Sequence, residues 1–353
     1  MRIGLIAPPW LPVPPPAYGG TEAVLDNLAR GLLARGHDVR LFTIGESTSP
    51  VHIRSLYAAA VEPIGAGIPA AAHVLAAYGE LSDADIIHDH TVLGPLIAAR
   101  RGPGSPPVVT TNHLPFTAIT RRIFAETARH AAIVAISRAQ ARSAGGIPIA
   151  AVIHHGIDLD VYKPGPGGGG YVLFVGRMCA DKGVHRAVRV AKRAGRKLVI
   201  AAKIRDQDEK SYFEQDVRPL LSADDDVPAE QPLPQRLELL GHAEALLNPI
   251  NWPEPFGLVM AEALASATPV LAFPRGAAPE IVDHGKTGYL CRDEDEMVKA
   301  IGAAARLDRD QCRAAAERRF SMHRMVADYE RLYQAILATG GVTSRAWRAG
   351  LTA

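Results

Sequence analysis

The sequence of 353 residues is poor in cysteine, nearly neutral and free of long apolar runs, and each of these features excludes a class of protein. Its three cysteines, Cys179, Cys291 and Cys312, are odd in number and lack CxxC spacing. They argue against a disulfide-rich secreted domain and against a structural zinc site, and they predict a cytoplasmic protein with reduced thiols. The 39 basic and 37 acidic residues give a net charge of +2, which offers no electrostatic reason to expect a nucleic-acid partner.

Other signals are missing as well. No stretch of about 18 consecutive apolar residues is present, so the sequence predicts no transmembrane helix. The apolar part of the opening MRIGLIAPPW is too short for a secretory signal and runs into prolines. The dinucleotide fingerprint G-x-G-x-x-G is missing after the first predicted strand, which argues against a nicotinamide-dependent oxidoreductase.

What the sequence does contain is an alternation of short apolar segments with helical patterns. The length favours two domains, and apolar strands joined by helices indicate parallel sheets covered on both faces. Segment 163–170, KPGPGGGG, is typical of an interdomain linker, and residues 293–339 are helical in pattern. The predicted strands are 2–7, 38–44, 85–90, 107–113 and 132–137 in the first half and 171–177, 197–204, 245–250 and 269–274 in the second.

Ligands of open α/β sheets bind beyond the carboxyl ends of the strands, so the loops after the strands are candidates for chemistry. Gly19 and Gly20 follow the first strand and open a helix, where backbone N–H groups can approach an anion; an ordinary glycine turn with a Thr21 cap is the alternative. Arg177 and Lys182 flank the loop GRMCADKG after the first strand of the second half. This pair suits a diphosphate, unless both are solvated surface cations.

The stretch NWPEPFGLVMAEALA places two carboxylates eight positions apart. Glu254 lies in a proline-flanked loop, and Glu262 lies more than one turn inside a helix that we expect to begin near Gly257. The amides of Gly257, Leu258 and Val259 would be free donors of the first turn, where the helix dipole favours an anion. Glu254, the start of the helix and Glu262 would then offer, in this order, a hydrogen-bond acceptor, an anion site and a second acceptor. A nucleotide sugar presents its sugar hydroxyls, diphosphate and ribose hydroxyls in the same order. Alternatively, Glu254 only caps the dipole and Glu262 pairs with a cation.

The segment EPFGLVMAE resembles the E-x(7)-E motif of the retaining glycosyltransferases of family 4, the glycosyl transferases group 1. YGGTEAVLDNLARGLLARGHDV, VIHHGIDLDVYKP, GRMCADKG and TPVLAFPRGAAPEIVDHGKTGYL resemble, in order, that family's phosphate loop, hinge, diphosphate clamp and the region after its catalytic helix. The resemblance implies an α/β protein of GT-B fold, with two Rossmann-like, doubly wound parallel-sheet domains facing a central cleft and a C-terminal helical segment. The implied domains are 1–162 on the acceptor side, 163–320 for the nucleotide sugar, and 321–353 as a C-terminal helix, which can pack back on the first domain, and a tail.

The resemblance also implies a role for each candidate residue. Glu254 would bind the donor sugar's hydroxyls near the reacting carbon, and Glu262 would bind the ribose hydroxyls. Arg177 and Lys182 would hold the diphosphate and stabilise the leaving group. The resemblance places His113 near the donor sugar as a further catalytic group, and the implied nucleotide-sugar-binding set is completed by Gly19, Gly20, Phe256, Gly257, Leu258 and Val259.

The implied reaction is retaining transfer of a sugar from a nucleoside-diphosphate donor, with a UDP-sugar favoured, to a hydroxyl acceptor by front-face attack. The departing phosphate would help to deprotonate the acceptor, and the protein would position and stabilise charge. No metal and no other cofactor are expected, because Arg177 and Lys182 neutralise the diphosphate. The acceptor (lipid, polysaccharide or natural product) and the oligomeric state stay open. Acceptor specificity would lie in the loops 8–20, 45–80 and 112–122.

The chain departs from the family pattern in two places. His155 stands where the hinge usually carries Asn. The strand and the Gly-Glu-Val-like turn that normally precede the helix at 234–242 are hard to find in 222–235, which leaves the nucleotide base open.

Two other functions remain open. One is a nucleotide-sugar 2-epimerase, for which Asp89 and His90 could supply acid/base groups, and the other is a non-catalytic nucleotide-sugar-binding protein. The aspartate clusters in 83–86 and 224–226 resemble metal ligands, but structural carboxylates are the better interpretation. Segment 119–133 is predicted to be a basic amphipathic helix, either with a solvated face or with a weak peripheral membrane contact.

Overall fold

The computed structural model describes residues 1–17, 19–98, 101–102, 104–228 and 230–342 of the chain. The chain forms two compact units. Unit 1 comprises Met1–Gly156 and the C-terminal segment that begins at Met322, and unit 2 comprises Ile157–Ser321. The units divide at 156/157 and 321/322, whereas the sequence placed the divisions at 162/163 and 320/321.

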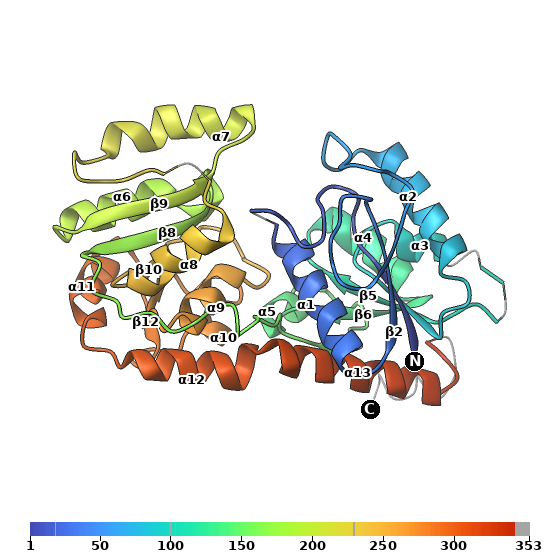
Figure 1. Cartoon of the computed structure of the whole chain (residues 1–353). Helices are drawn as coiled ribbons and strands as arrows, with labels where there is room; N and C mark the ends of the chain where they lie inside the picture. The colour runs from blue at the N-terminus through green and yellow to red at the C-terminus, as the bar shows by residue number, and fades with distance from the viewer. Residues whose placement is uncertain (18, 99–100, 103, 229, 343–353) are drawn as a thin grey trace. The chain divides into compact units, whose positions relative to one another are not determined.

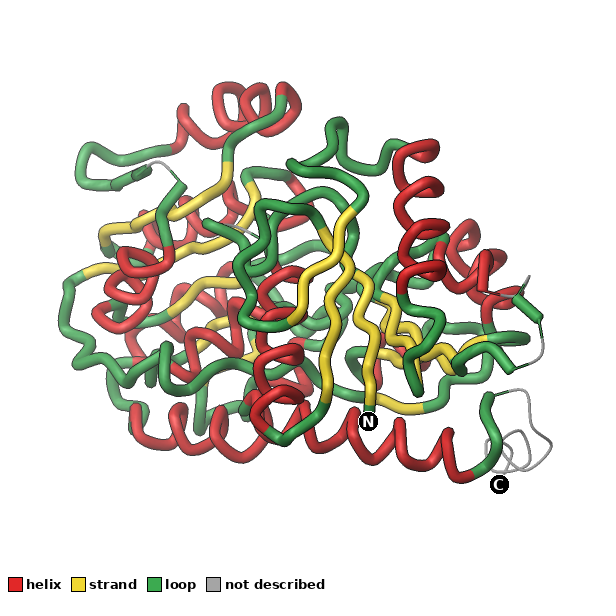
Figure 2. The backbone as a smooth tube through the Cα atoms, turned by 45° about the vertical axis from the view of Figure 1, so that its right-hand side comes forward, coloured by secondary structure: helices red, strands yellow, loops and turns green. Residues whose placement is uncertain are grey.

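Unit 1 is built on a parallel sheet of seven strands in the order β3-β2-β1-β4-β5-β6-β7. Strands β2, β5 and β6 of this sheet are labelled in Figure 1, and strands are drawn in yellow in Figure 2. The central strand β1 is an unbroken apolar run in which Ile3, Leu5 and Ile6 are fully buried, as expected for a strand covered on both faces. Before the chain enters unit 2, the elements are β1 (Arg2–Ile6), α1 (Gly20–Ala34), β2 (Asp38–Thr43), β3 (His52–Ser55), α2 (Gly67–Glu80), β4 (Ile86–Asp89), α3 (Gly94–Ala98), β5 (Val108–Asn112), α4 (Ala118–Thr127), β6 (Ala131–Ala135), α5 (Arg138–Arg142) and β7 (Ala151–Val152).

The helix α13 (Met322–Ala338) completes unit 1 by packing against α1 (Figure 1). Its apolar side chains recur at helical spacing, and Tyr329 and Tyr333 are fully buried. The two helices approach closely at Gly31 of α1, where an added Cβ would lie 2.4 Å from Cγ2 of Val326. The C-terminal helix therefore belongs to the core of unit 1. The tail residues 343–353 lie outside the described residues.

Unit 2 is built on a parallel sheet of five strands in the order β12-β11-β10-β8-β9 (Figure 1). Buried side chains of the strands and flanking helices, such as Phe174, Val188 and Leu271, form its core. The elements are β8 (Tyr171–Arg177), η1 (Ala180–Lys182), α6 (Val184–Arg193), β9 (Lys197–Lys203), α7 (Gln207–Tyr212), η2 (Phe213–Val217), η3 (Arg218–Leu220), α8 (Leu233–His242), β10 (Leu246–Asn248), α9 (Leu258–Ala265), β11 (Val270–Ala272), α10 (Ala278–Ile281), β12 (Gly288–Leu290), α11 (Glu294–Ala304) and α12 (Arg309–Phe320).

Two helix-flanked parallel sheets confirm the predicted fold class. Every predicted strand is present, with its ends within two residues of the predicted ends. The region 45–80 was treated as a loop and instead contains β3 and α2. Because β3 is mostly exposed, it lacks the continuous apolar run by which the other strands were recognised.

Segment 163–170, predicted to be the interdomain linker, lies within unit 2. Its backbone is held along unit 2, where Gly165 N–H donates to the Ser266 carbonyl (3.0 Å) and Gly167 N–H donates to the Gly241 carbonyl (2.9 Å). An added Cβ on Gly165 would lie 2.2 Å from Cα of Gly241. Glycines here serve close backbone approach, which a composition-based reading cannot distinguish from flexibility.

The family's expected strand in 222–235 is reduced to a single residue. Asp226 N–H donates to the Leu198 carbonyl (2.9 Å), and Ile200 N–H donates to the Asp226 carbonyl (2.8 Å). These two bonds form an isolated parallel bridge on β9. Among the described residues of 222–235 the bridge at Asp226 is the only strand-like pairing, in line with the weak strand signal of this segment in the sequence.

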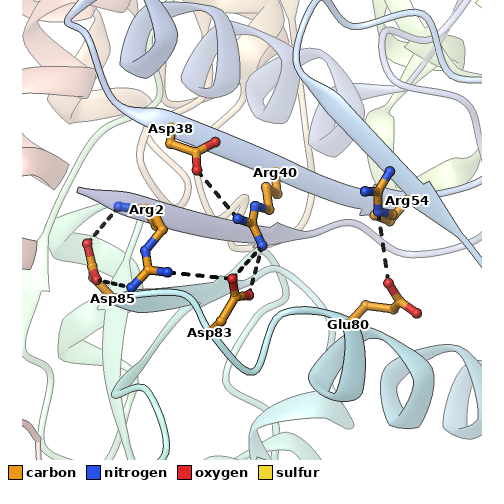
Figure 3. Close-up of polar contacts among 7 residues, drawn as sticks. All are labelled: Arg2, Asp38, Arg40, Arg54, Glu80, Asp83 and Asp85. Carbon is orange, nitrogen blue, oxygen red and sulfur yellow. Dashed lines mark hydrogen bonds and ion pairs between the residues drawn. The ribbon is translucent and has the colours of Figure 1, made fainter.

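The aspartates at 83–86 lie in exposed ion pairs at the end of the unit 1 sheet where β1 and β2 begin (Figure 3). Arg2 pairs with Asp85 (3.4 Å), and Arg40 pairs with Asp83 (2.8 Å). The hydrogen bond from Arg40 lowers the pKa of Asp83 below its usual value. In unit 2, Asp225 accepts hydrogen bonds from two backbone amides. These carboxylates are engaged by the protein itself, as the structural interpretation requires.

The basic helix predicted over 119–133 is shorter than expected. The helix α4 ends at Thr127, and residues from Ala131 onward form β6, because AAIVA is a buried strand. On α4 the side chain of Ile119 is 74% exposed, and just beyond the helix Arg129 pairs with Glu126 (3.3 Å). Within the described part of the chain, no helix is long and apolar enough to cross a bilayer.

Candidate functional site

The two cations of the GRMCADKG loop lie where β8 reaches its carboxyl end. Arg177 is the last residue of β8, and Lys182 is the last residue of the short turn η1. Gly183 follows in a left-handed conformation (φ 74°) and leads into α6. Lys182 is paired with Glu254, while Arg177 has no ion-pair partner among the described residues. The loop therefore presents one engaged and one unengaged cation.

Glu254 lies between β10 and α9, and its backbone is held by the turn before α10. Ala277 N–H donates to the Glu254 carbonyl (3.0 Å), and an added Cβ on Gly276 (φ 55°) would lie 2.1 Å from that same oxygen. The Glu254 side chain is 13% exposed. Its Oε2 contacts Lys182 Nζ and accepts a hydrogen bond from Trp252 Nε1 (2.9 Å). The structure thus brings together Glu254 and Lys182, two residues that the sequence assigned to one site.

The helix α9 begins at Leu258 with Gly257 as its N-cap, so the predicted start is confirmed. Gly257 is left-handed (φ 88°), and no side chain of the described residues caps the helix. The amides of Leu258 and Val259 are thus first-turn donors beside Glu254. Phe256 has a different place from the one expected, because its side chain is 2% exposed and its ring meets Phe320 edge-on at 5.9 Å. Its ring serves the core of unit 2.

Glu262 lies in the second turn of α9, and no lysine or arginine of the described residues forms an ion pair with it. Its Oε1 accepts a hydrogen bond from the hydroxyl of Tyr162 (2.7 Å). Arg236 of α8 donates to that same hydroxyl (3.4 Å). Tyr162 is buried, and burial together with the neighbouring carboxylate raises the pKa of its phenol well above the usual value. A neutral phenol therefore fixes the orientation of the second carboxylate of the motif.

Replacing Tyr162 by Phe should lower the free energy of unfolding by about 1–2 kcal/mol, because it removes a partly buried hydrogen bond to a charged acceptor. Chemical denaturation of the two proteins measures this. The matched control is Tyr171→Phe in the same unit, whose hydroxyl donates to the neutral carbonyl of Leu239 (2.9 Å) and should cost less. Equal losses in both variants would mean that the Glu262 contact has no special weight.

The glycine loop of unit 1 leads directly into α1. Gly19 is the N-cap and Gly20 is the first helical residue, so the alternative Thr21 cap does not occur. Gly19 is extended (φ 174°), and its lack of a side chain matters for space, since an added Cβ would lie 2.6 Å from Cβ of Pro15. Glu22 in the first turn is buried, and burial raises its pKa to about 7. Sequence reasoning missed Glu22, although an acidic residue in a first helical turn is the usual signal.

His113 follows β5 and belongs to a row of four imidazoles in unit 1, which we call the histidine row: His88, His90, His113 and His155. His113 Nε2 lies 2.9 Å from His90 Nδ1, and its ring stacks on that of His155 with centroids 5.2 Å apart. The rings of His88 and His90 are 4.0 Å apart. Burial lowers the pKa of all four, and that of His113 lies at about 4. Neutral imidazoles are therefore the stable form near pH 7.

The inner end of the histidine row is anchored by α13. His88 Nδ1 lies 2.7 Å from the Tyr333 hydroxyl, and His88 Nε2 lies 2.8 Å from Oγ1 of Thr111. Thr111 Oγ1 in turn lies 2.8 Å from the Tyr329 hydroxyl. His155, noted in the sequence only as a departure from Asn, is thus a member of the group around His113. No sequence signal links these positions, because they come from three strand ends and the C-terminal helix.

Asp89, offered as a possible acid/base group of an epimerase, is buried inside unit 1. Its Oδ2 accepts from the Tyr78 hydroxyl (2.8 Å), and its Oδ1 accepts from the amide of Thr91 (2.7 Å). Burial raises its pKa to about 6. Both oxygens are held by the protein, which favours a structural role for this carboxylate.

Unit 2 also has an open cavity of about 680 Å³ beside α8. None of the residues predicted for the site lines it. Its lining residues are Gly169, Tyr171, Asp226, Pro228, Gln231, Pro234, Gln235, Glu238, Leu239 and His242. Gly169 and Tyr171 precede or open β8, so this cavity reaches the end of the strand opposite Arg177.

Comparison with known protein families agrees with the motifs and the two parallel sheets. Residues 18–161 match Glycosyltransferase Family 4, and residues 163–319 match Glycosyl transferases group 1. The chain belongs to the family 4 glycosyltransferases. The second match covers nearly all of unit 2, the first covers unit 1 from residue 18 to its end at Gly156, and the two meet close to the boundary at 156/157.

This family 4 member resembles glycogen synthase of Mycobacterium tuberculosis at 31% identity over 198 residues, 52% of the chain and 46% of the synthase. The chain thus spans about half the length of that curated relative. Among solved structures it is similar to AviGT4, a glycosyltransferase involved in avilamycin A biosynthesis, with 26% identity, a TM-score of 0.73 and coverage of 96% of this chain and 98% of that one.

A third similarity, to HepE of Anabaena in complex with UDP and glucose, concerns the fold. The TM-score is 0.74 at 20% identity, with coverage of 95% of this chain and 100% of the other. Together with the two parallel sheets, these similarities confirm the GT-B fold expected for the family 4 chain.

Proposed function

We propose that this protein transfers a sugar, with retention, from a nucleoside-diphosphate donor to a hydroxyl acceptor. The observation that carries the proposal is the grouping in unit 2 of Lys182, Glu254 and the uncapped start of α9. A cation, a carboxylate and first-turn amides are the groups that a diphosphate and the hydroxyls of its sugar require. Arg177, at the end of β8, adds a second positive charge.

In the proposed reaction the acceptor oxygen attacks the anomeric carbon from the face on which the donor phosphate leaves. The bond from the anomeric carbon to the β-phosphate oxygen breaks, a bond to the acceptor oxygen forms, and the acceptor proton passes to the departing phosphate. The products are the glycoside and the nucleoside diphosphate. The protein's part is electrostatic: Arg177 and Lys182 stabilise charge that develops on the phosphate. With these two cations in place, we propose that the reaction requires no metal.

Residues of unit 1 complete the proposal. We assign His113 to the neighbourhood of the donor sugar and Gly19 and Gly20 to phosphate binding, as the family resemblance implies. The lowered pKa of His113 supports a neutral imidazole, which can donate or accept a hydrogen bond without adding charge. Phe256 drops out of the binding set as a side chain, because its ring lies in the core.

The donor base and the acceptor are the open parts of the proposal. The relatives differ in what their names specify: one is a glycogen synthase, one acts in avilamycin A biosynthesis, and one is a complex with UDP and glucose. A UDP-sugar is our first choice of donor. The resemblance implies that segment 222–235 helps to frame the base, and this segment pairs with β9 by a single bridge at Asp226, so the base is the part of the donor most open to revision.

Calorimetric titration with UDP, GDP, ADP and dTDP, each with and without EDTA, tests the donor site. We expect one nucleotide to bind in the micromolar range, to bind equally well in EDTA, and to lose about tenfold or more in affinity in Glu262→Ala, since a carboxylate–diol contact is lost. The matched control is Glu317→Ala, an exposed carboxylate of the same unit whose ion-pair partner among the described residues is Arg313 on its own helix. Binding of none of the four would refute the proposed donor site.

A donor-hydrolysis assay separates the alternative functions. A transferase releases some free sugar in the absence of acceptor, an epimerase yields an isomeric nucleotide sugar, and a binding protein yields neither. The burial of Asp89 between Tyr78 and Thr91 leads us to expect free sugar and no isomer.

A further inference from the structure

Lys182, Glu254 and Trp252 contact one another in a closed triangle. The Lys182 ammonium contacts Glu254 Oε2 and lies 5.0 Å from the centre of the Trp252 ring. The Trp252 indole N–H donates to the same Oε2 (2.9 Å). The side chains of Lys182 and Glu254 are only 16% and 13% exposed. Each of the three side chains thus has its polar or charged group engaged by another member of the triangle, at a place shielded from water.

This triangle conflicts with the roles proposed for two of its members. The proposed function requires Lys182 to hold the diphosphate and Glu254 to accept hydrogen bonds from the sugar. In the structure the charge of Lys182 is neutralised by Glu254, and Oε2 of Glu254 already has two donors. A diphosphate brought to Lys182 would meet the negative charge of Glu254 beside it. At low exposure both the attraction and the repulsion are stronger than on an open surface.

We propose that donor binding exchanges one ion pair for another: Lys182 leaves Glu254 for the diphosphate, and the released carboxylate then accepts the sugar hydroxyls. This inference rests on the proposed function and deepens it. The diphosphate carries more negative charge than one carboxylate and therefore attracts the Lys182 ammonium more strongly than Glu254 does. Glu254, having lost its cation, recovers the acceptor capacity that a diol can use.

Trp252 is the positioning residue of the exchange. Its indole N–H is a donor only, so it stays bonded to Oε2 when Lys182 departs and keeps the carboxylate beside the start of α9. Its ring also gives the ammonium a second favourable contact, a cation–π interaction, during the move. A sugar without a diphosphate cannot draw Lys182 away from Glu254. In this exchange the diphosphate therefore binds first, and Glu254 binds the sugar hydroxyls afterwards.

The exchange predicts an unusual combination of effects for Glu254→Gln. This variant should lose sugar transfer but bind UDP (or the nucleoside diphosphate that the titration selects in its place, here and below) about 5- to 30-fold more tightly than the native protein, because Lys182 is free from the start. Uridine, which has no phosphate, should bind equally to both proteins. Glu254→Ala should also gain UDP affinity, and it serves as a second variant should the glutamine protein fold poorly.

A double-mutant cycle with Lys182→Met shows whether the gain passes through Lys182. Calorimetry on the native protein, the two single variants and the double variant gives the four UDP affinities. We expect the gain from Glu254→Gln to shrink to less than twofold when Lys182 is Met. A gain of the same size in both backgrounds would mean general repulsion by the Glu254 charge and would overturn the exchange.

Trp252→Phe supplies the remaining measurement. It should leave the affinity for UDP within about twofold and lower the ratio by which UDP-glucose binds more tightly than UDP. An unchanged ratio would overturn the role of Trp252. If the native protein binds UDP and Glu254→Gln gains nothing, the exchange is wrong and the donor site stands. If neither the native protein nor any variant binds UDP, GDP, ADP or dTDP, both are refuted.

Discussion

Replacing Arg177 by Ala should slow sugar transfer by two to three orders of magnitude while leaving the stability of the protein nearly unchanged. Losing one electrostatic donor at a site of developing charge typically costs about 10²–10³ in rate. Arg177 has no ion-pair partner among the described residues, so the substitution breaks no salt bridge that the fold depends on. Steady-state kinetics with the donor found by titration, together with thermal unfolding, measures both effects.

The matched control is Arg218→Ala. Arg218 is an arginine of the same unit, its side chain is 64% exposed, and its ion pair is with Glu214 one turn away. It should change neither rate nor stability appreciably, since exposed pairs contribute about 0–1 kcal/mol. A rate for Arg177→Ala within tenfold of the native rate would remove Arg177 from the transfer step and leave Lys182 as the cation that acts on the phosphates.

The elements of this fold could be predicted where the sequence signal is local. β8 is an apolar run that ends in Arg177, and the start of α9 is marked by Gly257 after two prolines; both lie where the sequence placed them. The end of α4 was mispredicted because a helical pattern and the strand AAIVA compete at Ala131, and burial in the sheet decides. The packing of segment 163–170 along unit 2 could not be predicted, because glycine permits both flexibility and close packing.

The contacts of the candidate site could not be predicted, because they depend on packing between distant segments. The E-x(7)-E spacing identified Glu254 and Glu262 but not the donors that hold them, Trp252 and Tyr162. The partner of Glu262 lies a hundred positions earlier in the chain, in a segment read from sequence only as part of the hinge. The neighbours of His113 were equally hidden. A motif therefore names the groups, whereas the fold determines which of them are already engaged.

Unit 1 should become markedly less stable as the pH falls from 7 toward 5. Burial lowers the pKa of every member of the histidine row, so these imidazoles stay neutral in the folded protein while the unfolded chain binds protons below about pH 6.5. Stability is therefore complete above that pH and is lost as the pH falls. Asp89 and Glu22 act in the opposite direction, because their raised pKa values of about 6 and 7 let the folded protein take up protons first.

The four protons of the histidine row favour the unfolded chain, and so does that of His73 in α2, whose pKa burial also lowers. Against the two that favour the folded protein, the net is about two to three protons near pH 5, or roughly 3–4 kcal/mol per pH unit. Urea denaturation at pH 7.5, 6.5, 5.5 and 5.0 measures the slope. His155→Asn removes one member of the histidine row and should reduce the slope by about 1.4 kcal/mol per pH unit, whereas His52→Asn, at an exposed position on β3, should not change it. A slope near zero, or one that His155→Asn leaves untouched, would show that the row is protonated in the folded protein, and a neutral His113 could then no longer be assumed beside the donor sugar. A slope that depends on His155 would instead link the stability of unit 1 to the same neutral imidazoles on which the proposed role of His113 rests.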